Sequence, residues 1–315
     1  MPRRRPVVVA SKNGAVALPA AMDVLRRGGS ALDAVEAAAR IVEADPADTS
    51  VGRGGWPNIL GTVEVDASIM DGATRRAGSV GAVRGYLHPI SIARAVMERL
   101  PHVMLVGDGA MRFADEIGAE RARLLTARTR GLWVDFLRLV RETPRSVARR
   151  RELAPVVMRT VRLERKGTVN FIAIDAQGHM ASAVSTSGWG YKYPGRLGDS
   201  PIIGAGNYCD ERYGGACCTG FGELAMRALT AKTAVDRLAA GLSPEEVARC
   251  AIADVNELDA PRPAAMNVIV LAHDGRYASA TNRRYTTLER KERRRFAVMT
   301  AEMPEPLVLD RTLVK

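Results

Sequence analysis

TVNFIAID at residues 168–175 and MASAVST at residues 180–186, separated by a Gln177-Gly178 turn, are the two runs that decide the fold of this chain. Both runs consist largely of apolar, β-branched and small residues, and the residues between them favour a turn, so this stretch predicts a β-hairpin. Because small or apolar residues occupy both faces of each strand, we expect their sheet to be covered on two sides.

The register of this hairpin predicts a contact between two hydroxyl groups. A hairpin that turns near Gln177-Gly178 pairs residues whose numbers add up to about 354 or 355. Thr168 and Thr186 satisfy that condition, so we expect their side chains to meet across the strand pair if the turn places them on the same face. Threonine pairs also occur in ordinary sheets, so the register alone leaves a structural and a chemical interpretation open.

The rest of the chain alternates less regularly between strands and helices. The order lacks repeated β-α-β units, which favours an α+β fold over a doubly wound sheet. Residues 118–166 are rich in arginine and poor in glycine, and we expect them to form a charged connector with one helix at 132–140. The other expected elements are a strand at 7–10, helices at 15–27 and 31–44, a glycine-rich loop at 48–58, strands at 62–66 and 68–70, helices at 89–100, 222–240 and 243–258, and a hairpin of 266–273 with 276–281.

Size and composition restrict the class of protein. The chain has 315 residues, of which 47% are hydrophobic, which fits one or two folded domains with a substantial core. No apolar run approaches the roughly 18 residues that a membrane span requires. The apolar run at residues 7–10 is too short for a secretory signal. We therefore expect a cytoplasmic protein without a membrane partner.

The charge and the metal-binding residue types point to no cofactor. The net charge is +11, and only six of the 46 basic residues are lysine. Such a balance indicates either polyanion binding or an arginine-rich solvated surface; the low aromatic content of 5% argues against base stacking and nucleic-acid recognition. The four cysteines and four histidines show no metal-ligand spacing, so we expect no metal site.

Two short glycine-rich segments carry residues that suit recognition of a small molecule. Arg196 and Asp199 lie three residues apart in one loop; arginine can hold a carboxylate bidentately and aspartate can hold an ammonium group, so together they suit an α-amino acid. A local surface ion pair is the alternative. Thr219-Gly220 offers a hydroxyl and backbone N–H groups for an oxyanion, or it is only the entry to a helix.

The combination of these motifs resembles the glycosylasparaginase and plant-type asparaginase family of N-terminal nucleophile (Ntn) hydrolases. The resemblance extends over about residues 8–281. It is carried by Thr168-Val169, STSGW at 185–189, PGRLGDSP at 194–201, GAG at 204–206 and TGFGE at 219–223, with Asp45-Pro46, TSVG at 49–52, Gly54-Gly55, MDG at 70–72 and Ala77-Gly78 upstream.

The resemblance implies that the chain cuts itself between Gly167 and Thr168. An internal threonine has no nearby base, whereas the α-amine freed by such a cut has a pKa near 8 and can take the hydroxyl proton. Glycosylasparaginases usually carry aspartate before the nucleophile, and this chain has Gly167, as in the asparaginase and isoaspartyl peptidase branch. That departure leaves the branch and the rate of self-cleavage open.

Carried over to this chain, the family's site comprises seven residues. Thr168 is the nucleophile, Thr186 tunes it by hydrogen bonding, and Thr219 with Gly220 forms the oxyanion hole. Arg196 holds the substrate α-carboxylate and Asp199 holds its α-ammonium group, while Gly167 and Thr168 flank the self-cleavage point. Trp56 and Trp189 either line the space beyond the scissile amide or serve packing.

The family's fold and assembly are also implied. We expect one domain over residues 1–315 with a four-layer αββα Ntn-hydrolase sandwich, cut into an α chain of residues 1–167 and a β chain of residues 168–315. We expect these αβ units to form homodimers and to need no cofactor. The expected activity is hydrolysis of a glycosylated asparagine amide; an L-asparaginase or isoaspartyl peptidase and, more remotely, a non-catalytic polyanion-binding protein are the alternatives.

Overall fold

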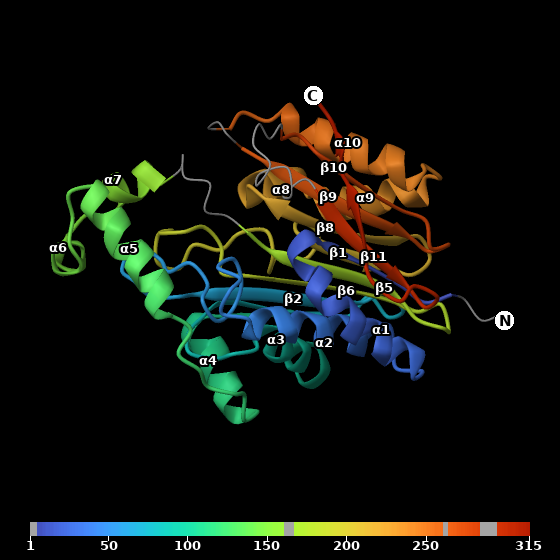
Figure 1. Cartoon of the computed structure of the whole chain (residues 1–315), viewed down its shortest axis with the longest axis horizontal. Coiled ribbons are helices and arrows are strands. Elements are labelled where there is room, and N and C mark those ends of the chain that lie inside the picture. Colours follow the sequence, from blue (N-terminus) through green and yellow to red (C-terminus); the bar gives the residue numbers. More distant parts are fainter. Residues whose placement is uncertain (1–4, 161–166, 261–263, 284–294) are drawn as a thin grey trace.

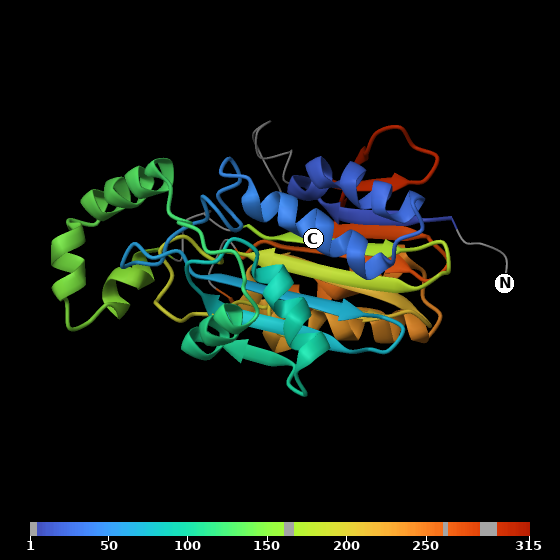
Figure 2. The same cartoon turned by 90° about the horizontal axis from the view of Figure 1, so that it is seen from below.

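Two β-sheets lie face to face, and helices cover their outer sides (Figures 1 and 2). The computed structural model of the chain describes residues 5–160, 167–260, 264–283 and 295–315. Within these residues the larger sheet has eight strands in the order β12-β11-β1-β5-β6-β2-β3-β4, and the smaller has five in the order β13-β10-β9-β8-β7. The expected α+β fold with four αββα layers is therefore confirmed.

The strands of the larger sheet come from both halves of the chain. They are β1 (Val7–Ser11), β2 (Val65–Asp71), β3 (Ala77–Val83), β4 (Met104–Val106), β5 (Val169–Ile174), β6 (Met180–Thr186), β11 (Arg295–Thr300) and β12 (Leu307–Asp310). The smaller sheet contains β7 (Asn207–Asp210), β8 (Gly214–Gly220), β9 (Met266–Ala272), β10 (Tyr277–Thr281) and β13 (Thr312–Leu313).

Each sheet is covered by its own set of helices. A 3-10 helix (Lys12–Ala17), α1 (Leu18–Arg26), α2 (Ala31–Ala44) and α3 (Pro89–Arg99) cover the larger sheet, and α8 (Gly222–Ala228), α9 (Thr230–Ala239) and α10 (Pro244–Asn256) cover the smaller one. Ser30 and Ser243 accept hydrogen bonds from Asp33 N–H and Glu246 N–H and so cap α2 and α10. No helix in the described part of the chain is long and apolar enough to cross a membrane.

Alternate residues of one strand enter different parts of the core. On β5, Phe171 packs between the larger sheet and its helices, whereas Ile172 packs between the two sheets. On β8, Cys217 faces the space between the sheets and Cys218 faces the helices of the smaller sheet. Because successive strand side chains point to opposite faces, this arrangement confirms the two-sided burial expected from the apolar hairpin.

The central hairpin has the expected register. Val169 pairs with Ser185 and Asn170 pairs with Val184. The residue numbers of each pair therefore add up to a sum inferred from the position of the turn. The hairpin of β9 and β10 is also confirmed, with Leu271 paired to Tyr277. The first hairpin lies in the larger sheet and the second lies in the smaller sheet.

Three expectations about local structure are wrong in detail. The strands expected at 62–66 and 68–70 are one strand, β2. It begins later than expected because Asn58 Oδ1 accepts hydrogen bonds from the N–H groups of Leu60 and Thr62, which holds residues 58–62 in a turn. The helix expected at 15–27 starts as the 3-10 helix. The helix expected at 222–240 is interrupted at Leu229, which has a φ of 48°.

The helix expected at 132–140 is confirmed, but it belongs to a helical arm that takes the place of much of the expected connector. After α4 (Gly107–Glu116), the chain forms α5 (Ala127–Leu139), α6 (Pro144–Arg149) and α7 (Ala154–Val157), which project from one end of the sandwich (Figure 1). Thr126 and Thr143 begin α5 and α6 with reciprocal capping hydrogen bonds. The last part of the expected connector, residues 161–166, lies outside the described residues.

Candidate active site

A chain of hydroxyl groups leads from Thr168 to the peptide bond before it. The Thr168 hydroxyl donates to Thr186 Oγ1 at 3.3 Å, as the hairpin register predicts. Thr186 Oγ1 in turn donates to the Gly167 carbonyl oxygen at 2.7 Å and accepts a hydrogen bond from Gly188 N–H at 2.9 Å. Both threonines are buried. Thr186 therefore contacts the hydroxyl and the carbonyl that a self-cleavage reaction would join.

Only glycine fits at the residue before Thr168. A Cβ atom on Gly167 would lie 2.1 Å from the Cβ of Ser50, far inside van der Waals contact. Ser50 is itself fixed, because its hydroxyl donates to Asp48 Oδ1 at 2.5 Å and accepts from Asn13 Nδ2 at 3.3 Å. The Gly167–Thr168 peptide group is thus held between Thr186 and the loop that carries Ser50.

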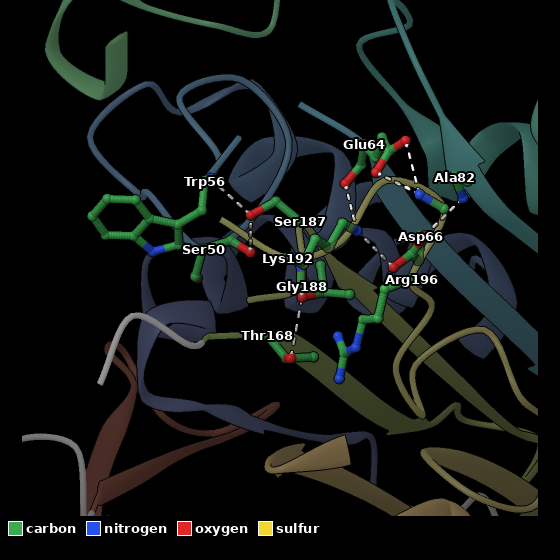
Figure 3. Close-up of polar contacts among 12 residues, drawn as sticks. Ser50, Trp56, Glu64, Asp66, Ala82, Thr168, Ser187, Gly188, Lys192 and Arg196 are labelled. Atoms are coloured by element: carbon green, nitrogen blue, oxygen red, sulfur yellow. Dashed lines mark hydrogen bonds and ion pairs between the residues drawn. The ribbon is translucent and has the colours of Figure 1, made fainter. Parts of the chain in front are cut away.

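A small pocket opens beside this peptide group. It brings together six of the seven residues expected from the sequence. Its lining consists of Gly167, Thr168, Thr186, Gly188, Trp189, Arg196, Gly198, Asp199, Ser200 and Gly220. In Figure 3 the Arg196 side chain extends toward the same space as Thr168.

The guanidinium group of Arg196 is already oriented by a carboxylate. Its Nε and Nη2 atoms donate to Glu223 Oε1 at 3.0 and 2.8 Å, and Nη2 also donates to Glu223 Oε2 at 2.9 Å. The guanidinium carbon lies 4.7 Å from the centre of the Trp189 ring, a distance that suits a cation–π contact. The alternative of a simple Arg196–Asp199 surface pair is wrong, since the fork of Arg196 faces Glu223.

The Asp199 carboxyl group is buried, and one of its oxygens has no hydrogen-bond partner among the described residues. It is only 4% exposed, and its Oδ2 has no hydrogen-bond partner among the described residues. Burial raises the pKa of the Asp199 carboxyl to about 7, and the nearby Arg196 guanidinium opposes that rise. Gly222 allows this packing, because a Cβ there would lie 2.4 Å from Asp199 Oδ1. A ligand ammonium group would supply the missing partner.

Thr219 and Gly220 end strand β8 next to the pocket. Gly220 lines it and has a φ of +125°, and a Cβ at this position would lie 2.1 Å from the Ala265 carbonyl oxygen. Thr219 lies outside the lining, and its Oγ1 accepts a hydrogen bond from Asn267 Nδ2 at 2.9 Å. Because Asn267 supplies a donor, the hydroxyl hydrogen of Thr219 is free to be donated to another acceptor. Both the oxyanion interpretation and the helix-entry interpretation fit, since α8 starts at Gly222.

The two tryptophans have different places. Trp189 lines the pocket and contacts Phe221, with ring centres 4.7 Å apart. Trp56 packs edge-on against Tyr191 at 6.2 Å and does not belong to the pocket lining. Of the two positions proposed for the space beyond the scissile amide, the structure therefore places only Trp189 in the site.

Sequence reasoning missed the residues that orient the site. Glu223 lies in the TGFGE segment at 219–223, but the sequence does not show that its carboxylate contacts Arg196, and Asn267 lies on a different strand with no local signal. The buried pair of Lys192 and Asp66 was also missed, because no local motif links these two residues. Such partners depend on tertiary contacts across the two sheets.

Comparisons with known proteins agree with the motif resemblance. A family model described as Asparaginase matches residues 6–299. The chain is 42% identical to an N(4)-(Beta-N-acetylglucosaminyl)-L-asparaginase from Elizabethkingia miricola, over 79% of this chain and 68% of the relative. It is 38% identical to an Isoaspartyl peptidase/L-asparaginase from Mus musculus, over 73% and 66%, and 35% identical to a Plant-type L-asparaginase from Pyrococcus furiosus, over 88% and 86%.

These relatives cover the chain to different extents. The chain spans about two thirds of the length of the first two and most of the length of the third. The matched segment includes the hairpin, the Arg196–Asp199 loop and the end of β8. The resemblance seen in the sequence is confirmed, and this chain belongs to the asparaginase family.

Proposed function

We propose that this protein is a self-activating N-terminal threonine amidohydrolase that hydrolyses the side-chain amide of an asparagine-type substrate and releases aspartate. The observation that carries the proposal is the hydroxyl chain from Thr168 through Thr186 to the Gly167 carbonyl oxygen, placed beside a pocket with Arg196 and Asp199. Family membership supports the same chemistry.

Self-cleavage follows from the contacts of Thr186. The Thr168 oxygen attacks the carbonyl carbon of Gly167, and its proton passes to the departing nitrogen, so that an ester replaces the peptide bond. Thr186 donates to the Gly167 carbonyl oxygen and stabilises the negative charge that develops there. Water then hydrolyses the ester and leaves Thr168 with a free α-amine.

Substrate turnover uses the same oxygen with the new amine as its base. The substrate α-carboxylate binds Arg196 and its α-ammonium group binds Asp199 Oδ2, which places the side-chain amide at Thr168. The amine takes the hydroxyl proton while Thr168 attacks the amide carbon. Thr219 Oγ1 and Gly220 N–H stabilise the oxyanion, the leaving amine departs with the proton, and water hydrolyses the acyl-enzyme to give aspartate.

The preferred leaving group separates two versions of this activity. The 42% identity to a glycosylasparaginase supports a glycosylated asparagine as substrate, and the glycine at position 167 supports an L-asparaginase or isoaspartyl peptidase instead. The test compares kcat/KM for N-acetylglucosaminyl-asparagine, asparagine and β-aspartyl dipeptides with one enzyme preparation. We expect the glycosylated substrate to be hydrolysed most efficiently, and a preference of more than about tenfold for either of the others would assign the second version.

The assembly and location of the protein are part of the same proposal. We infer that the cleaved αβ units form homodimers, which light scattering during gel filtration would show as twice 33.9 kDa; a single-unit mass would contradict this. The described cysteines Cys209, Cys217, Cys218 and Cys250 are free thiols, which supports a reducing, cytoplasmic compartment. We propose no nucleic-acid or membrane partner, and steeply salt-dependent DNA binding would contradict that.

A further inference from the structure

Lys192 lies completely buried behind the wall of the candidate site. Its side chain and that of Asp66 are both 0% exposed, and Lys192 Nζ lies 3.6 Å from Asp66 Oδ2. Lys192 Nζ also donates to the Glu64 carbonyl oxygen at 3.2 Å. Burial lowers the pKa of the Lys192 ammonium, and the Asp66 carboxylate opposes that shift. Because the desolvation of two buried charges can exceed the gain from their attraction, such a pair is weak evidence for stability.

Asp66 belongs to the same row of residues as the two threonines. It pairs with Thr186 across β2 and β6, and Thr186 contacts Thr168 across β6 and the start of β5. Three neighbouring strands therefore present Thr168, Thr186 and Asp66 at one level of the sheet. Asp66 Oδ1 accepts a hydrogen bond from Ala82 N–H at 2.8 Å. Its Oδ2 has no hydrogen-bond partner in the described part of the chain and lies 3.6 Å from Lys192 Nζ.

Lys192 reaches Thr186 by a second route, through the turn at Gly188. A Cβ on Gly188 would lie 3.1 Å from Lys192 Nζ and 3.3 Å from Arg196 Nη1, and Gly188 has a φ of +74°. The N–H of this tightly packed glycine donates to Thr186 Oγ1 at 2.9 Å. Figure 3 shows Lys192 between the acidic residues Glu64 and Asp66 and the turn at Gly188.

We propose that Lys192 and Asp66 are positioning residues for both the self-cleavage and the turnover of this enzyme. Their ion pair fixes Thr186 from two directions, through the neighbouring strand and through the Gly188 turn, and so directs the Thr186 hydroxyl at the Gly167 carbonyl oxygen and at Thr168. The inference rests on the proposed function and adds to it the residues that set the geometry of Thr186.

The ion pair predicts a non-additive response to substitution. Lys192→Met or Asp66→Asn leaves one buried charge without its partner, which moves the surrounding backbone, whereas the double variant contains neither charge. We expect each single variant to cleave itself at least about tenfold more slowly than wild type. In the fraction that is cleaved, we expect kcat for asparagine to fall by about tenfold and KM to change by less than about threefold, because Thr186 moves and the Arg196–Glu223 pair does not. The double variant should be about as slow as the slower single variant and no slower, because the two residues act as one pair.

The matched control is Lys232→Met, which removes a lysine from an exposed pair with Asp236, 2.5 Å away on α9. Its self-cleavage and turnover should equal those of wild type. Thermal unfolding of every variant separates a positioning role from a purely structural one, which would lower Tm and leave both rates unchanged well below Tm. If Lys192→Met does not fold, Asp66→Asn and the double variant make the same comparison.

A folded single variant with wild-type rates of both reactions would overturn the inference, and so would an increase in KM alone. Rate losses in the double variant equal to the product of the two single losses would also overturn it, because the residues would then act independently. Failure of the proposed function is distinguishable, since in that case wild type itself neither cuts before Thr168 nor hydrolyses asparagine.

Discussion

At the scale of single residues, the proposed chemistry depends on a hydroxyl group that takes part in several hydrogen bonds and on a buried carboxyl group with an oxygen that has none among the described residues. Thr186 Oγ1 takes part in three hydrogen bonds, with Thr168, Gly167 and Gly188. Asp199 has an oxygen without a partner among the described residues. These are the groups that a reacting peptide or a bound amino acid would engage, so their removal has specific consequences.

Thr186→Val keeps the shape of the side chain and removes the hydroxyl. We expect self-cleavage to slow by about 10²- to 10³-fold, because the Gly167 carbonyl oxygen loses the donor that stabilises its developing charge. Mass spectrometry of samples taken over time after purification measures the uncut fraction. Thr186→Ser is the matched control and should cleave at nearly the wild-type rate; equally fast cleavage in Thr186→Val would remove Thr186 from the mechanism.

The raised pKa of Asp199 predicts how pH affects binding. Burial raises this pKa to about 7, so the carboxyl group is ionised above that pH and neutral below it. Only the ionised form attracts the α-ammonium group of a ligand. We expect the inhibition constant of L-aspartate to increase by up to about tenfold for each pH unit below 7. Succinate, which has no ammonium group, is the control, and the same pH dependence for both inhibitors would contradict the assigned role of Asp199.

The candidate site could be predicted from the sequence where its residues form a local motif. The Thr168–Thr186 contact follows from the length of one hairpin, and Arg196, Asp199 and Gly220 lie in short glycine-rich segments. Glu223 and Asn267 could not be assigned in this way. Their importance comes from the atoms they contact, and for Asn267 the contact joins residues 48 positions apart on neighbouring strands.

At the scale of elements, the helical arm α5–α7 contacts the loop that carries Arg196 of the candidate site. Tyr191, which lies in the same loop as Arg196, donates to the Leu132 carbonyl oxygen at 2.7 Å and stacks on Phe136 with ring centres 4.1 Å apart. The arm thus fastens the site loop to the α-chain part of the molecule. The cluster that joins them contains Ile59, Trp133, Phe136, Leu137, Val147, Val156 and Tyr191.

Phe136→Ala should loosen this arm. Loss of a buried phenylalanine costs about 3–5 kcal/mol, and here the cost falls on the contact with Tyr191. We expect trypsin to cut at the arginines of α5 and α6 at least about tenfold faster than in wild type. Leu139→Ala, at an 80% exposed position on the same helix, is the control and should leave the cutting rate unchanged. Equal resistance of Phe136→Ala would mean that the aromatic stack does not hold the arm.

The same arm shows where sequence patterns were insufficient at this scale. Its many arginines suggested an irregular connector, yet Thr126 and Thr143 each begin a helix with side-chain caps. The apolar face of α5 packs against Tyr191 and Ile59, both distant in the sequence. Strands β3 and β8 were likewise not anticipated, because small residues and glycines weaken the alternating pattern that identifies a strand.

At the scale of the whole molecule, strands from both prospective fragments alternate in one sheet. β5, which follows Thr168, lies between β1 from the first half and β6 from the second, and β6 in turn pairs with β2 from the first half. The two-sided burial of the hairpin was predictable from its apolar pattern, whereas the four αββα layers were implied by the family resemblance. We therefore expect a cut before Thr168 to leave both fragments in one folded unit that separates only in denaturant.

Mass spectrometry of the purified protein under native and denaturing conditions, with wild type beside Thr168→Ala, tests the central claim most directly. We predict that denatured wild type gives two fragments that meet between Gly167 and Thr168, that the native protein keeps them together, and that Thr168→Ala stays one chain without asparaginase activity. Fully active wild type that remains a single uncut chain would contradict the account.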